Sequence, residues 1–398
     1  MSLHVGPIAP ATTAFNRRSL ASLSMTREGT RDLRLDFFRG LALAFIFIDH
    51  ITDNVIARFT LHSFAFCDGA EMFIFISGYT AAIAYTPTFD RQGVARGVAR
   101  IYRRAWQLYI AHLFLFVIVA AEVSFTLAYG FTPPIAKEMA TGEYLGIQNQ
   151  AILRVITLTA QPDLLVILPA YIIMLLGLPW MLLLMRRNVL LWLVPSGMLY
   201  LLAITFEWNL PASTGPKVWF FNPLAWQFLF STGVALSLSR GRIPWPRMLV
   251  VAAFIFAAAA CFVAIGGRLY GLFPRFLSAL AWIPSPYFDK VYLEPERLLS
   301  FMALAVIVAD RLGPNAGVFH ARLSRAVILC GQHSLEIFCL TTVLAVPGEW
   351  VLDSVNYDLR MQVVVIMTGL LLMTGYAALL RWFRTSDRGR QGLRTASA

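Results

Sequence analysis

The chain has 398 residues, of which 58% are hydrophobic and only 14% are charged. A soluble domain of this size could not bury so much apolar surface, so the composition excludes that class and predicts an all-α polytopic membrane protein. The formal net charge is +11, but the basic residues lie between apolar runs, so the charge does not indicate nucleic-acid binding. The four cysteines have neither CxxC nor Cys/His metal spacing, and we therefore expect no disulfide and no metal site.

Residues 1–34 are rich in Ser, Thr and Arg and contain no apolar core, so we expect a disordered cytoplasmic tail and not a signal peptide. Met25 is an alternative start within this tail. Residues 35–384 form one predicted transmembrane domain, and residues 385–398 form a C-terminal cytoplasmic tail. The domain contains ten apolar runs of bilayer length, at about 36–57, 68–87, 105–129, 164–185, 189–206, 219–238, 248–266, 297–311, 326–346 and 361–383.

The distribution of basic residues predicts the orientation of these spans. An even number of spans places both termini on one side of the membrane. The tails and loops on that side contain 24 of the 33 Lys and Arg residues. Because Lys and Arg concentrate in cytoplasmic loops, both termini are expected in the cytoplasm. Two long loops, residues 130–163 and 267–296, would lie on the opposite side.

The first predicted span carries two ionisable residues on one face. Arg39 lies near its start and His50 lies about midway along it. The eleven-residue separation returns to nearly the same helix face about 16 Å further along. An ionisable group at that depth is costly and usually marks a substrate or proton path. The alternative interpretation is a histidine that is hydrogen-bonded to a neighbouring helix for packing alone.

Four carboxylates can approach His50 if the first two spans form a hairpin. They are Asp49, Asp53, Asp68 and Glu71. A carboxylate bonded to one ring nitrogen leaves the other nitrogen as an acceptor, which is the arrangement that a general base needs. Glu71 is the preferred partner, with Asp49 as the second choice. Asp53 and Asp68 are equally consistent with loop or helix-end positions.

The second predicted span contains Ser77 and Gly78, two small residues that allow a helix or a ligand to approach the backbone closely. Helix packing alone explains them equally well. Four arginines then gather before the third span, where Arg100 and Arg103 are one helical turn apart and can bind one anion together. Cytoplasmic loops also collect arginines for topological reasons, and the cluster taken alone slightly favours that explanation.

Two later groups are weaker signals. Aromatic side chains that include Trp226, with Glu296 at the head of the eighth span, suit a sugar ring, although interfacial aromatic belts have the same composition. His333 and Glu336 share a face at the start of the ninth span. They could form a second His/Glu pair, but a structural role is favoured.

Several of these blocks together resemble a known family. The Arg39-x10-His50 spacing, the Phe-x-x-Ser-Gly-aromatic signature and Arg100-x-x-Arg103 resemble the transmembrane acyltransferases. Within that superfamily four blocks are similar to OpgC, the succinyltransferase family of osmoregulated periplasmic glucans. The blocks are Arg31-Asp-Leu-Arg-Leu-Asp-Phe-Phe-Arg-Gly, Glu71-Met-Phe-Ile-Phe-Ile-Ser-Gly-Tyr-Thr, Phe221-Asn-Pro-Leu-Ala-Trp-Gln and Gly331-Gln-His-Ser-Leu-Glu-Ile-Phe. One block departs from the family, because Ile167 stands where an acidic residue is expected.

The resemblance implies a multi-pass enzyme of the bacterial inner membrane with ten core helices. Such an enzyme is a succinyl-CoA-dependent O-acyltransferase that transfers an acyl group from cytoplasmic acyl-CoA to glucose hydroxyls of a periplasmic glucan, with no permanently bound cofactor. By motif position His50 is catalytic, and Arg39, Arg100 and Arg103 hold the donor. Glu71 and Asp49 are expected to assist His50. Asp68, Trp226 and Glu296 are expected on the glucan side.

A transporter for a glycan or an organic anion is the alternative function, because embedded charges and a basic entrance suit it as well. No inverted repeat and no matched pair of broken spans supports it. The sequence leaves homo-oligomerisation open, and it does not distinguish direct transfer from an acyl-histidine relay. A dicarboxylic acyl group would need a further cation, for which Lys217, Arg268, Lys290 and Arg297 are candidates.

Overall fold

The computed structural model describes residues 32–131, 153–212, 218–239, 246–272, 288–313 and 316–396, without the side chains of 268–272 and 387–396. The expected N-terminal tail with Met25, and Lys217, lie outside the described residues, as does the side chain of Arg268. Eleven α-helices form the described part. They are α2 (Leu33–His50), α3 (Gly69–Gln92), α4 (Val94–Ala128), α7 (Ile167–Arg187), α8 (Leu190–Thr205), α9 (Pro223–Leu238), α10 (Arg247–Leu272), α11 (Pro295–Arg311), α12 (Arg322–Gln332), α13 (Ser334–Ser354) and α14 (Leu359–Ala396).

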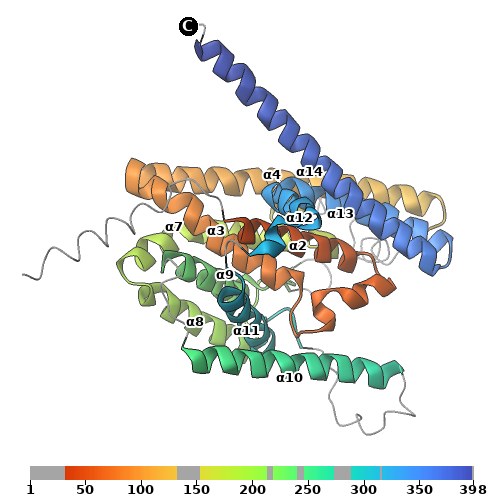
Figure 1. Cartoon of the computed structure of the whole chain (residues 1–398), viewed down its shortest axis with the longest axis horizontal. Coiled ribbons are helices and arrows are strands. Elements are labelled where there is room, and N and C mark those ends of the chain that lie inside the picture. Colours follow the sequence, from red (N-terminus) through yellow and green to blue (C-terminus); the bar gives the residue numbers. More distant parts are fainter. Residues whose placement is uncertain are drawn as a thin grey trace, which may run out of the picture.

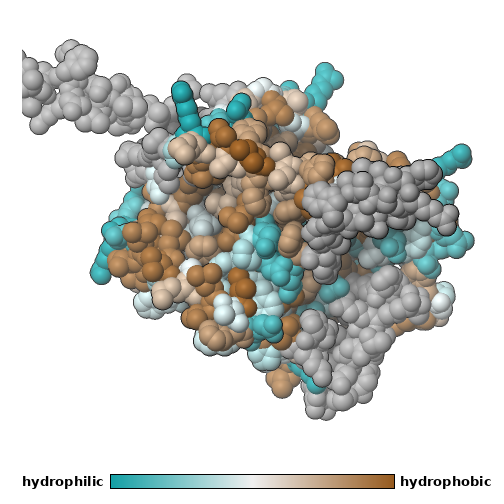
Figure 2. Space-filling view, turned by 90° about the horizontal axis from the view of Figure 1, so that it is seen from below, coloured by the Kyte–Doolittle hydropathy of each residue, from teal (hydrophilic) through white to brown (hydrophobic). Residues whose placement is uncertain are grey.

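The all-helical prediction is confirmed for the described residues, and six of the helices are long and apolar enough to cross a membrane: α3, α4, α7, α10, α13 and α14. Only 22% of the most apolar stretch of α10, and 22% of that of α14, is buried inside the protein. Hydrophobic side chains accordingly cover much of the face in Figure 2. An apolar surface of this kind faces lipid. Ten spans and the side of the termini remain predictions.

The helices are arranged around a central group. α3 packs against α9 and α2, and α2 packs against α12. In Figure 1, α4 and α10 lie along opposite edges of the body, and α14 extends beyond it to the C-terminal end. The residues expected to form a C-terminal tail therefore continue the α14 helix as far as Ala396.

Glycine pairs permit close backbone contact at two helix–helix interfaces. A Cβ added at Gly78 of α3 would overlap the backbone carbonyl of Phe230 in α9, and one at Gly233 of α9 would overlap the backbone of α3. In the same way, a Cβ added at Gly40 of α2 would overlap the backbone of α12, and one added at Gly331 of α12 would overlap the backbone of α2. Small residues permit this approach, which supports helix association where lipid removes the hydrophobic driving force. The packing interpretation of Gly78 is therefore confirmed.

We expect Gly78→Ala to lower the free energy of unfolding by about 1–3 kcal/mol, because the added methyl group meets backbone atoms that cannot rotate away. Thermal unfolding in detergent measures the effect. Gly375→Ala is the matched control, because a Cβ there has no neighbour within 4 Å. An unchanged midpoint in Gly78→Ala beside an unchanged control would contradict the close-packing argument.

The first predicted span is shorter than expected. The prediction of a helix over 36–57 with His50 at its middle is wrong, because α2 ends at His50 itself. Polar side chains cause this ending: Asn54 donates to the carbonyl of Ile48 at 2.8 Å. Glu349 and Gln362 accept hydrogen bonds from backbone N–H groups just beyond the helix, at 3.0 and 2.7 Å. Satisfying the freed backbone groups in this way is what permits a helix to end inside a membrane domain.

The ninth predicted span also needs correction. Residues 326–346 do not form one helix, because α12 ends at Gln332 and α13 begins at Ser334. His333 lies between them with a backbone conformation outside the helical region (φ −118°, ψ 40°). Apolar residues lie on both sides of this break, so the sequence pattern predicts one span.

Candidate active site

A cavity of about 170 Å³ lies between five helices. We call it the arginine cavity. Its lining comes from α2, α3, α4, α7 and α13 and comprises Arg39, Phe73, Ser77, Thr80, Ala81, Ala84, Tyr85, Arg104, Leu108, Leu168, Tyr171, Ser334, Leu335 and Phe338. The cavity therefore unites the second and fourth sequence blocks, which are more than 240 residues apart in the chain.

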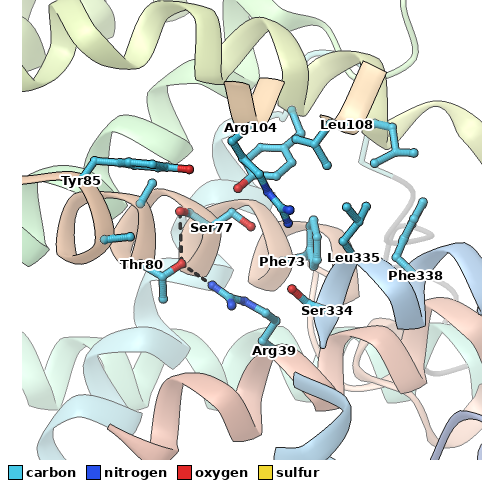
Figure 3. Close-up of a pocket in the computed structure, with 14 residues that line it drawn as sticks. Arg39, Phe73, Ser77, Thr80, Tyr85, Arg104, Leu108, Ser334, Leu335 and Phe338 are labelled. Carbon is cyan, nitrogen blue, oxygen red and sulfur yellow. Dashed lines mark hydrogen bonds between the residues drawn. The ribbon is translucent and has the colours of Figure 1, made fainter. Parts of the chain in front are cut away.

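Two guanidinium groups enter this cavity from opposite walls. Figure 3 shows Arg39 extending from α2 and Arg104 extending from α4 towards the space between them. Arg39 donates a hydrogen bond to the hydroxyl of Thr80, and this hydroxyl donates to the carbonyl of Ile76 at 2.8 Å. Two arginines facing one space form a site for an anion, because guanidinium groups bind phosphate and carboxylate oxygens in pairs.

The other arginines of the predicted cluster lie at or beyond the edge of the cavity. Arg100 donates to the hydroxyl of Thr88 at 2.7 Å and stands 5.9 Å from the centre of the Tyr85 ring. Arg103 is exposed and does not line the cavity. The structure thus brings together Arg39 and Arg104 where the motif had pointed to Arg100 and Arg103. Arg103 and Arg104 are neighbours on α4 and point in different directions from the helix, and it is Arg104 that enters the cavity.

A second, smaller cavity of about 60 Å³ contains His50, and we call it the histidine cavity. Its lining comprises Ile46, Asp49, His50, Asp68, Ala70, Asp163, Leu164, Val166, Ile167, Phe221 and Lys290. The Nδ1 atom of His50 is buried and has no hydrogen-bond partner within the described residues. Arg39 and His50 lie on the same continuous helix, about 16 Å apart along its axis. α2 therefore links the two cavities.

Neither expected carboxylate partner reaches His50 in the described structure. Asp49 accepts a hydrogen bond from Thr60 at 2.8 Å and lies 3.3 Å from the ring of His62. Glu71 has no exposed surface and accepts from the Arg297 guanidinium at 2.8 Å. Both side chains are therefore engaged elsewhere, and any effect they have on His50 is exerted through the shape and charge of the cavity.

Four charged side chains form a compact cluster beside the histidine cavity. Asp68 pairs with Lys290 at 2.6 Å and with Arg297 at 3.0 Å. Glu71 pairs with the same Arg297 at 2.6 Å and accepts from the backbone of Asp68 at 2.8 Å, which completes a capping box at the start of α3. Two negative and two positive charges balance each other, so the cluster is neutral. Of the two cation candidates whose side chains the structure describes, Lys290 lines the histidine cavity and Arg297 does not.

The residues expected on the glucan side take different places. Asp68 lines the histidine cavity. Trp226 is fully buried and donates to the backbone carbonyl of Lys290 at 3.0 Å, so it positions the lysine and presents no ring to the cavity. Glu296 is exposed and does not line the cavity. Asp163 also lines the histidine cavity, although the sequence analysis did not predict it. It begins a short 3₁₀ helix that follows Pro162.

The Gly331–Phe338 block contributes to the arginine cavity by residues other than the predicted pair. Ser334, Leu335 and Phe338 line the cavity. Glu336 faces away and pairs with Arg384 of α14 at 2.9 Å. The structural role favoured for Glu336 agrees with this ion pair. In the described part of the chain, no group of three or more His, Cys, Asp or Glu side chains is placed to hold a metal ion.

Comparison with known proteins gives one result. A family model described as OpgC protein matches residues 31–385, which covers both cavities and all eleven described helices except the end of α14. No curated protein and no solved structure matches the chain.

Proposed function

Because this chain belongs to the OpgC family and is a membrane acyltransferase, we propose that it transfers a succinyl group from acyl-CoA to a glucose hydroxyl of a periplasmic glucan. The observation that carries this proposal is the pairing of the two cavities on α2. One cavity holds two facing arginines and the other holds a histidine with an unbonded ring nitrogen. Such a pair suits a reaction whose two substrates approach from opposite sides of a membrane.

The arginine cavity is the proposed donor side. Phosphate groups of CoA would bind between Arg39 and Arg104, with Arg100 at the edge beside Tyr85 and the exposed Arg103 contacting phosphates outside the cavity. The pantetheine arm would extend along α2 towards His50. We propose that the donor side, and with it both termini, faces the cytoplasm of a bacterial cell whose inner membrane holds the protein. The many basic residues of the expected cytoplasmic regions support this orientation.

The histidine cavity is the proposed acceptor side. Asp68 and Asp163 present carboxylate oxygens that accept hydrogen bonds from sugar hydroxyls. His50 takes the proton of the attacking hydroxyl as its oxygen bonds to the thioester carbon, the C–S bond breaks, and the proton passes to the departing thiolate. Lys290 is the cation proposed to bind the free carboxylate of a succinyl group.

An acyl-histidine relay is the second route compatible with this arrangement. His50 would attack the thioester itself and carry the acyl group to the acceptor. Succinyl-CoA given without acceptor separates the two routes, because only the relay adds a succinyl mass to the protein.

The function is tested by release of free thiol from acyl-CoA by purified protein in proteoliposomes. We expect turnover with succinyl-CoA and a short β-glucan, a lower rate with acetyl-CoA, and a product that carries the acyl group. No thiol release with any acyl-CoA, together with flux of a glycan or organic anion across the vesicle, would replace the proposal with a transporter.

The donor site gives a separate prediction. We expect Arg39→Ala and Arg104→Ala each to raise the KM for acyl-CoA by about 10-fold or more, because each removes a charge-assisted contact of about 1.5–3 kcal/mol. Steady-state kinetics at fixed glucan measures the change. Arg322→Ala, at an exposed position of α12, is the control. If Arg104→Ala behaves like this control, the donor phosphates do not lie between the two arginines.

A further inference from the structure

A second histidine lies within the membrane domain and has no role in the mechanism above. His112 belongs to α4 and none of its surface is exposed. Neither of its ring nitrogens has a hydrogen-bond partner among the residues that the structure describes. Buried polar groups are nearly always paired, so a histidine with both nitrogens unsatisfied requires an explanation. A leucine of similar size would fill such a position at lower cost.

The buried face of α4 that carries His112 reaches the wall of the arginine cavity. The buried face of this helix contains Leu108, His112, Leu115 and Val119 in succession. One turn before His112, Leu108 lines the arginine cavity. Two turns beyond it, Val119 belongs to the same apolar cluster as Leu164, which lines the histidine cavity. The buried face that carries His112 therefore begins at the arginine cavity, and its far end shares an apolar cluster with a wall residue of the histidine cavity.

The depth of His112 agrees with this placement. Arg104 and His112 are eight residues apart on α4, which is about 12 Å along the helix axis. Arg39 and His50 are about 16 Å apart on α2. Each histidine thus lies further along its helix than the arginine that enters the arginine cavity (Figure 3).

We propose that His112 is a further catalytic residue that binds the thioester end of the donor. This proposal rests on the acyl transfer proposed above. A neutral imidazole has one N–H donor and one acceptor nitrogen. The N–H of His112 donates a hydrogen bond to the thioester carbonyl oxygen, on which negative charge develops as the hydroxyl attacks the carbon. A donor fixed beforehand in a site without water stabilises that charge strongly. His112 keeps its proton throughout, and the hydroxyl proton follows the path through His50.

His112→Leu tests the proposal, with His112→Gln as the variant that restores a donor. We expect His112→Leu to reduce kcat by about 10²- to 10³-fold, the usual effect of removing one such donor, and His112→Gln to recover part of it. The thermal midpoint of His112→Leu should be unchanged or higher, because the substitution removes an unsatisfied polar group from the interior. Leu115→Met, on the same buried face, is the packing control.

A binding measurement separates this proposal from the proposed function. A stable thioether analogue that keeps the acyl carbonyl should bind wild-type protein more tightly than CoA does, and His112→Leu should abolish that difference while CoA binds normally. Full activity in His112→Leu would overturn the role of His112 and leave the acyltransferase intact. If His112→Leu has a lower thermal midpoint and His112→Gln recovers no activity, His112 has a structural role only. Wild-type protein that turns over no acyl-CoA would refute both proposals.

Discussion

Replacing His50 by alanine is expected to lower the rate of acyl transfer by about 10²- to 10⁴-fold, the range contributed by a positioned general base. His50 ends α2 inside the membrane domain, lines the cavity proposed for the acceptor and presents an unbonded ring nitrogen. Without the imidazole, the attacking hydroxyl loses the unbonded ring nitrogen that is proposed to take its proton. Thiol release from succinyl-CoA in the presence of glucan measures the loss.

Binding and folding should survive this substitution. The side chain of His50 lies at the end of α2, so we expect His50→Ala to fold normally. Its affinity for acyl-CoA should also be kept, because the arginine cavity lies about 16 Å away along α2. His320→Ala, at an exposed site near α12, is the control for loss of a histidine. Activity within a few-fold of wild type in His50→Ala would exclude His50 as the base and as the relay.

Replacing Arg297 by leucine is expected to destabilise the protein by about 3–5 kcal/mol, the cost of leaving buried charges unpaired. Arg297 contacts both carboxylates at the start of α3, and Glu71 has no other cation within the described contacts. Removing the guanidinium leaves Glu71 buried and charged, and Asp68 retains only Lys290. Unfolding in detergent, followed by heat or denaturant, measures the change.

A second substitution shows whether pairing is the cause. Arg297→Leu/Glu71→Leu removes the orphaned charge and should recover a large part of the lost stability, because replacing both partners of a buried pair by apolar groups is close to neutral. Arg360→Leu, at an exposed arginine, should leave stability unchanged. If the double variant is less stable than Arg297→Leu, the two effects add, and the ion pair is not the source of the destabilisation.

The charge cluster also connects stability with the site. Lys290, held by Asp68 and by the indole of Trp226, reaches the histidine cavity from the segment before α11. Loss of Arg297 would therefore disturb the cavity wall as well as the fold. Activity that falls in Arg297→Leu and stays low in the double variant, while stability recovers, would identify this second effect.

Several features of the protein follow from the sequence alone. Apolar runs of bilayer length require helices, since only a helix satisfies its own backbone in lipid, and the all-helical fold was predictable for that reason. Arg39 and His50 were identifiable because the cost of placing ionisable residues in an apolar helix makes them conspicuous. The family could be predicted from local blocks, and the match over residues 31–385 confirms it.

Other features depend on contacts between distant segments. Helical periodicity places residues on a face but does not name the neighbour, so the inward position of Arg104, the pairing of Glu71 with Arg297 and the burial of Trp226 were not predictable. The end of α2 depends on Glu349, a residue almost 300 positions away that bonds the backbone beyond the helix.

The sequence by itself thus determined the class of protein, its all-helical character and the residues that are costly in a membrane, because these depend on composition and on local backbone bonding. Only the tertiary structure decided how helices are joined, where α2 stops and which side chains share a cavity. Those outcomes depend on contacts between side chains and backbone groups far apart in the sequence, and contacts of this kind leave no periodic signal in the chain.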